Sequence, residues 1–146
     1  MCFIDVVEIA ANIAAVAGSV ISACVFKHSI KRERQILTIK TFSKFRQKFP
    51  KEIVKMSNDE RKDYLREIEF FCLGINNKIY DFDTLRKMSG KRLLSQYKKM
   101  KYFVNIRRKE RNEDSIGCEY EKVMKRLECY YCTDKKIIQK IFCRKK

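Results

Sequence analysis

Residues 9–26 read IAANIAAVAGSVISACVF and carry no charged side chain, whereas residues 27–34 read KHSIKRER and are strongly basic. A helix over 9–26 would rise by about 27 Å, close to the thickness of a thin hydrocarbon core, and Lys27 can extend that reach. The stretch therefore predicts a transmembrane helix at 9–26. The alternative is a buried helix in a soluble core, which the polar side chains of Asn12 and Ser19 favour.

The distribution of charge predicts an orientation in the membrane. All 34 Lys and Arg residues follow Phe26, and the leader at 1–8 contributes only Asp5 and Glu8. The positive-inside rule places the N-terminus outside the cell inner membrane and the rest of the chain in the cytoplasm, as a single-pass protein. Residues 21–24 also resemble a bacterial lipobox, but the acidic leader argues against a secretory signal.

Small residues recur at every fourth position inside the predicted transmembrane helix, at Ala10, Ala14, Gly18 and Ser22. Such a stripe lets a second helix approach closely, and packing drives the association of helices in lipid. The stripe therefore predicts a homo-oligomer that forms through this segment. The alternative is that an Ala-rich helix contains these spacings by chance.

The seven cysteines favour a reducing compartment, because their number is odd and their spacing forms no regular framework. Cys129 and Cys132 have the CxxC spacing of zinc ligands, and Cys118 and Cys143 could complete a four-thiolate site. A single CxxC without a second one is a weak metal signal. We therefore expect free thiols, no bound metal and no cofactor.

The rest of the chain has the periodicity of helices. A basic stalk is predicted over 27–50, where apolar side chains recur at intervals of three and four until Pro50 ends the helix. A domain follows over 57–146, and Ser57 and Glu60 fit a capping box at its start. The helices expected in this domain cover residues 58–75, 81–88, 91–111, 116–131 and 133–142.

Apolar stripes, such as Tyr64, Ile68 and Ile75, mark the faces of these helices that we expect to be buried. No stretch alternates strictly between apolar and polar residues like a half-buried strand. The expected fold class is all-α. An N-terminal transmembrane helix continues into the stalk and is followed by a small cytoplasmic bundle of about four to five helices.

Several short motifs follow one another in a recognisable order: YLREIE at 64–69, LGIN at 73–76, IYDF at 79–82, SGKR at 89–92 and the pair Arg107-Arg108. They resemble an uncharacterised bacterial family of small proteins that pair one membrane span with an all-helical cytoplasmic domain of unknown function. The resemblance covers residues 58–127 and implies no activity. The polar positions that it singles out are Glu67, Glu69, Tyr80, Asp81, Gly90 and Arg92.

Glu67, Asp81 and Arg92 allow two interpretations. In the functional one they form a polar pocket. In the structural one, which we favour, a carboxylate of the first domain helix caps or salt-bridges the turn at 80–81 and the helix start at 91–92. No His, Ser or Cys nucleophile accompanies these residues, so we expect no enzymatic activity.

The net charge of +16 is the remaining feature to explain. Each Lys or Arg near an anionic leaflet gains roughly 1 kcal/mol, so we expect contact with inner-leaflet lipids. Nucleic acid is an alternative partner, because Tyr97 and Tyr102 lie among the cations, and an acidic protein is another. The residues assigned to lipid or nucleic-acid contact are Lys27, Lys31, Arg32, Arg34, Lys98, Lys101, Arg107 and Arg108.

These features together predict a membrane-anchored, non-enzymatic binding or scaffold protein. One alternative is a membrane-tethered nucleic-acid-binding protein, which would bind oligonucleotides in a salt-sensitive way. Another is a membrane-perturbing effector of the holin or defence kind, which would cause dye leakage on overexpression. A scaffold would show neither behaviour.

Overall fold

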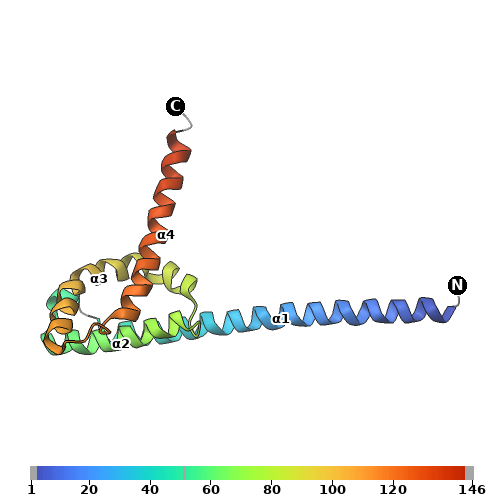
Figure 1. Ribbon diagram of the computed structural model, residues 1–146, viewed down its shortest axis with the longest axis horizontal. Coiled ribbons are helices and arrows are strands. Elements are labelled where there is room, and N and C mark those ends of the chain that lie inside the picture. The colour runs from blue at the N-terminus through green and yellow to red at the C-terminus, as the bar shows by residue number, and fades with distance from the viewer. Residues whose placement is uncertain (1–2, 51, 144–146) are drawn as a thin grey trace.

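The computed structural model describes residues 3–50 and 52–143, and the side chains of residues 16–50 and 52–132. Its elements are α1 (Phe3–Lys48), the 3-10 helix η1 (Ile53–Lys55), α2 (Asn58–Asn76), α3 (Phe82–Arg111) and α4 (Cys118–Cys143). Figure 1 shows a helical body from which the first part of α1 and the last part of α4 project. All regular structure in the described residues is helical, which confirms the all-α prediction.

The core lies where the four helices meet. Each helix places apolar side chains at intervals of three and four residues along one face, so that this face can be buried. Tyr64 and Ile68 of α2, Leu93 of α3 and Tyr120 of α4 all have an exposed fraction of 1% or less. The apolar stripe predicted on α2 is therefore a face that the structure buries.

Thr38 holds the last part of α1 on the body. Its buried hydroxyl donates to the carbonyl of Arg34 at 2.6 Å and accepts from the amide of Asp81 at 2.7 Å. Asp81 is the N-cap of α3, and its carboxylate accepts from the amide and the hydroxyl of Thr84. One buried hydroxyl thus joins α1 to the turn from which α3 begins.

Local sequence sets both ends of α2. The predicted capping box is confirmed, because the Ser57 hydroxyl accepts from the Glu60 amide and the Glu60 carboxylate accepts from the Ser57 amide. At the other end, the ring of Tyr80 stacks on Phe71 with centroids 4.9 Å apart. A Cβ at Gly74 would overlap the Tyr80 ring, so Gly74 lets the turn fold back onto α2.

Two helix ends that the sequence predicts are absent from the structure. The segment 82–111 is one helix, α3, without a break at Ser89-Gly90. Gly90 is buried, and a Cβ there would overlap the Tyr131 hydroxyl, so this glycine allows close packing of α3 on α4. Helix α4 is also continuous across residues 131–133. Tertiary packing, and not helix termination, accounts for the small residues in α3.

The transmembrane helix predicted at 9–26 is corrected by the structure. In the described part of the chain, no helix is both long enough and apolar enough to cross a membrane. Residues 9–15 lie outside the described side chains. This part of the predicted fold class is therefore wrong.

The turn between α3 and α4 depends on two residues with positive φ. Asn112, the C-cap of α3, has a φ of 50°, and Gly117, just before α4, has a φ of 76°. A Cβ at Gly117 would lie 2.9 Å from Cγ1 of Val104, in the core. Both the backbone conformation and the close approach of α3 therefore require glycine at this position.

We expect Gly117→Ala to lower the free energy of unfolding by about 2 kcal/mol, because it adds left-handed backbone strain and a contact with Val104. Urea denaturation followed by circular dichroism measures this loss. Gly18→Ala is the matched control, since a Cβ at Gly18 meets nothing within 4 Å and alanine favours helix. An equal loss in both variants would contradict the role given to Gly117.

Candidate functional site

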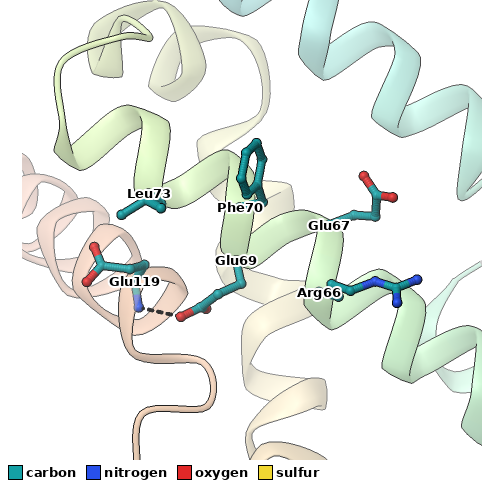
Figure 2. Close-up of a pocket in the computed structure, with 6 residues that line it drawn as sticks. All are labelled: Arg66, Glu67, Glu69, Phe70, Leu73 and Glu119. Carbon is teal, nitrogen blue, oxygen red and sulfur yellow. Dashed lines mark hydrogen bonds between the residues drawn. The ribbon is translucent and has the colours of Figure 1, made fainter.

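A shallow groove of about 600 Å³ lies on the outer face of α2, beside the start of α4. It combines an apolar floor with carboxylates, and Phe70 within it is 70% exposed. Figure 2 shows the Glu69 side chain turned toward α4, while Glu67 points away from it. The residues that line the groove are Arg66, Glu67, Glu69, Phe70, Leu73 and Glu119.

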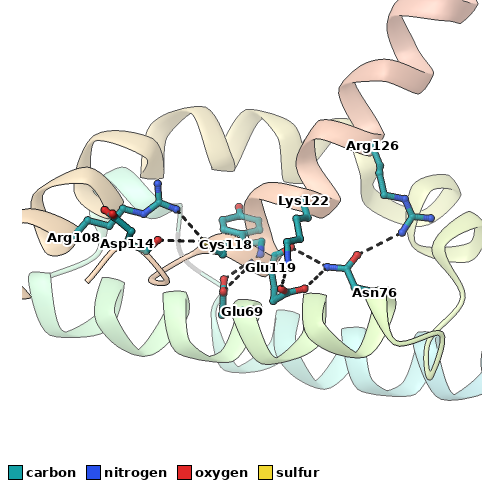
Figure 3. A network of polar contacts seen from close by, with 9 residues as sticks. Glu69, Asn76, Arg108, Asp114, Cys118, Glu119, Lys122 and Arg126 are labelled. Atoms are coloured by element: carbon teal, nitrogen blue, oxygen red, sulfur yellow. Dashed lines mark hydrogen bonds and ion pairs between the residues drawn. The ribbon is translucent and has the colours of Figure 1, made fainter. Parts of the chain in front are cut away.

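Glu69 joins the groove to the polar network in Figure 3. Its two carboxylate oxygens accept from the backbone amides of Glu119 at 2.8 Å and Tyr120 at 3.1 Å. The first amides of a helix have no partner within that helix, and a carboxylate also interacts favourably with the helix dipole there. Glu69 of α2 therefore acts as the cap at the start of α4.

Asn76 makes a second connection between α2 and α4. Its amide nitrogen donates to the Glu119 carboxylate at 2.6 Å, and its oxygen accepts from Arg126 at 3.5 Å. Lys122 also forms an ion pair with Glu119. These contacts extend the link between the two helices over the first turns of α4 (Figure 3).

Arg108 fixes the turn before α4. Its guanidinium donates to the carbonyl of Ile116 at 2.7 Å and to the carboxylate of Glu121 at 3.1 Å. The planar guanidinium can make both contacts at once, which a lysine ammonium does less well. Arg108 is half-buried. The structure therefore places this predicted contact residue inside the fold.

The pKa shifts in this network agree with structural roles. Burial raises the pKa of Glu69, and the amides that donate to its carboxylate oppose that rise. The hydrogen bond from Lys122 lowers the pKa of Glu119, and the one from Lys125 lowers the pKa of Glu121. Each carboxylate is engaged with a partner, so the network stabilises the fold and offers no acid paired with a nucleophile.

The polar positions suggested by the resemblance have separate partners. Glu67 forms an ion pair with Lys48 of α1 at 2.7 Å, whereas Asp81 caps α3. Arg92 is exposed and lies beside the small gap between α1 and α3. The structure does not bring Glu67, Asp81 and Arg92 into one pocket. The structural interpretation expected a carboxylate of α2 at the turn at 80–81 or at residues 91–92, and no such bond is found among the described residues. Glu67 pairs with Lys48, and Glu69 caps α4 instead.

The predicted basic residues of α3 divide into two groups. Lys98 and Lys101 are exposed, whereas Arg107 is half-buried and pairs with Glu110 at 2.9 Å. Lys109 was not among the residues assigned to lipid or nucleic-acid contact, and it is exposed on the same face as Lys98 and Lys101. The spacing of residues 98, 101, 105 and 109, at intervals of three and four, indicates that they share one helix face. We call Lys98, Lys101, Tyr102, Asn105 and Lys109 the lysine stripe.

Two further sets of predicted residues lie on the projecting part of α1. The basic residues Lys27, Lys31, Arg32 and Arg34 are all exposed. In the small-residue stripe, Gly18 has open space around it and Ser22 is exposed. Ala10 and Ala14 lie outside the residues whose side chains are described. The predicted pairing of this helix with a second copy stays a prediction.

The cysteines do not converge on one point. Cys118 and Cys129 are both on α4, and a helix places them about 16 Å apart along its axis, too far for one metal ion. The side chain of Cys143 lies outside the described residues. Burial raises the pKa of the Cys72 thiol, which makes it a poor nucleophile. Among the described residues, no cluster of His, Cys, Asp and Glu can hold a metal ion.

The fold and these sites define a small, basic, all-helical protein in which buried polar groups secure the helices and an exposed lysine stripe faces solvent. The chain belongs to the family described as "Domain of unknown function (DUF4760)", which matches residues 12–127. This finding confirms an uncharacterised family, while the bacterial origin stays a prediction. None of the curated proteins and none of the solved structures matches the chain.

We expect Glu69→Ala to lower the free energy of unfolding by about 1–3 kcal/mol, because it leaves two amides at the start of α4 without their acceptor. Glu67→Ala is the matched control. It removes only an exposed ion pair with Lys48, which is worth about 0–1 kcal/mol. Urea denaturation of the two variants tests this difference, and equal losses would contradict the capping role of Glu69.

The pKa of Glu69 also predicts the sign of a pH dependence. A raised native pKa means that the stability linked to this carboxyl is present below the unfolded pKa and is lost as pH rises through the native pKa. The unfolding free energy of the wild type minus that of Glu69→Gln should therefore fall as the pH rises above about 4, the pKa of an unperturbed Glu. Glu121→Gln should give the opposite slope, because the native pKa of Glu121 is lowered.

Urea denaturation at each pH measures this difference between the wild type and Glu69→Gln. A difference that stays constant or rises with pH would refute the raised pKa of Glu69. The slope is the diagnostic quantity, because Glu69→Gln also weakens the cap of α4 by an amount that changes little with pH.

Proposed function

We propose that this protein is a non-enzymatic binding protein that holds an anionic macromolecule on the lysine stripe of α3. The observation that carries the proposal is the state of Lys98, Lys101 and Lys109. All three are exposed, and none forms an ion pair within the part of the chain that the structure describes. Exposed cations on one helix face provide a surface for phosphate, sulfate or carboxylate groups.

Several other basic residues of the body are engaged within the protein. Lys62 pairs with Asp59, Arg66 pairs with Asp63, and Lys122 pairs with Glu119. These pairs reduce the local positive potential, because each brings a carboxylate beside the cation. The lysine stripe differs from these residues because it offers, on one helix face, cations that are unpaired among the described residues, and this contrast supports it as a surface for an external anion.

The overall charge and the projecting helix support the same proposal. A net charge of +16 attracts anionic partners over a distance of about 8 Å, the Debye length at physiological ionic strength. The exposed cations of α1, including Lys27, Lys31 and Arg34, add a second basic surface away from the body. A partner held on α3 can therefore gain further contacts along α1.

The polar groups of the groove on α2 favour binding over catalysis. Glu67, Glu69 and Glu119 are each engaged by a lysine or by backbone amides. General acid–base chemistry needs a group that is available to a substrate, with a second group that acts as nucleophile or base. The arrangement of these three carboxylates fits the stabilisation of helix contacts.

Elution from heparin-agarose, an immobilised sulfated polyanion, tests the proposal. The variant Lys98→Gln/Lys101→Gln/Lys109→Gln should elute at clearly lower salt than the wild type, because it loses three unpaired cations on one face. The matched control is Lys48→Gln/Arg66→Gln/Lys122→Gln, which removes the same charge from residues that are in ion pairs. Equal shifts in the two variants would show that only net charge matters and would refute the assigned surface.

A further inference from the structure

Tyr102 is the feature of the lysine stripe that charge alone does not explain. Its side chain is 76% exposed, although a tyrosine ring normally gains stability by burial. Lys98 lies one helical turn before it on the same face of α3, and Lys101 precedes it directly in the chain. By contrast, Tyr97 is buried in the core with its ring edge-on to Tyr120. The two tyrosines predicted near the cations therefore have different roles.

Tyr102 also forms one wall of a groove of about 380 Å³ between α3 and the start of α2. Phe103 and Ile106 supply further apolar surface, and the cations at its rim include Lys99 and Arg107. The groove thus joins an accessible aromatic face to a row of positive charges. A flat, apolar group that is attached to an anionic chain would match both properties.

We propose that the anionic macromolecule is single-stranded nucleic acid, with one base stacked on Tyr102 in this groove and the phosphates on the lysine stripe. This inference rests on the proposed function and names the partner. Stacking on an aromatic side chain and contact of cations with the backbone are the two interactions by which proteins bind single strands without sequence preference.

The ion pairs at the rim of the groove do not prevent this binding. Lys99 lies 3.7 Å from Glu52, and Arg107 lies 2.9 Å from Glu110. Pairs of this exposed kind contribute little to stability, so a phosphate can take the place of the carboxylate. The lysines of the stripe need no such exchange.

Single strands fit the site better than duplexes or lipid surfaces do. In a duplex the bases are stacked on one another, so that their faces cannot reach Tyr102. An anionic bilayer would use the lysines but would not require a ring that stands beside a groove of this size. The accessible face of Tyr102 is therefore the observation that favours single strands.

Fluorescence anisotropy with a short labelled single-stranded oligonucleotide tests the inference on the full chain. The comparison strands are an abasic oligonucleotide of the same length and the matching duplex. The wild type should bind the single strand more tightly than the other two. Tyr102→Ala should weaken binding to the single strand by about fivefold or more and should leave binding to the abasic strand nearly unchanged.

Two variants control for the ring and for folding. Tyr102→Phe keeps an aromatic face and should bind like the wild type. Phe70→Ala removes a ring that is 70% exposed on the outer face of α2, so it should leave the affinity unchanged. If Phe70→Ala weakened binding as much as Tyr102→Ala, the assignment of the stacking site to α3 would be overturned.

The outcomes separate this inference from the proposed function. Equal affinity of the wild type for intact and abasic strands, with heparin binding still dependent on the lysine stripe, would overturn base stacking and leave the proposed function in place. Binding to vesicles that contain phosphatidylserine but not to oligonucleotides would replace nucleic acid by lipid. If the lysine-stripe variant eluted from heparin-agarose at the same salt concentration as its control variant, the proposed function itself would be overturned.

Discussion

The contact between Glu69 and the start of α4 is the constraint on which the body of this protein depends. The first amides of a helix need acceptors, and α4 obtains two of them from a side chain of α2, fifty residues earlier in the chain. This contact sets the point at which α4 leaves the turn after α3. Tyr120, Val123 and Leu127 can then complete the core, while the last part of α4 projects (Figure 1).

The sequence predicted those parts of the fold that depend on local interactions. The capping box of Ser57 and Glu60 and the apolar stripe of α2 are determined within a few residues, and both are found in the structure. The helix end predicted at Gly90 was wrong, because this glycine serves a contact between residues far apart in the sequence. Its lack of a side chain makes room for Tyr131 of α4. The predicted transmembrane helix is the main expectation that the structure corrects.

The candidate sites show the same limit, since a sequence presents all charges as equivalent. Arg107 and Arg108 form a uniform basic pair in the sequence, yet Arg108 donates a hydrogen bond to the carbonyl of Ile116 and is held within the turn. The residues next to Arg108 in the sequence do not predict this contact. The carbonyl of Ile116 lies beside Arg108 only because the turn that contains Asn112 and Gly117 folds back. Lys98 and Lys101, by contrast, are exposed to solvent.

The lysine stripe is difficult to explain by folding alone. Like charges three or four residues apart on a helix, such as Lys98 and Lys101, destabilise it by about 0.2–0.5 kcal/mol per pair. Tyr102 adds an exposed ring that makes no contribution to the core. The buried polar groups, from Thr38 to Glu69, each satisfy a helix end or a turn. The anionic partner that we propose would account for these exposed residues, which the internal contacts do not explain.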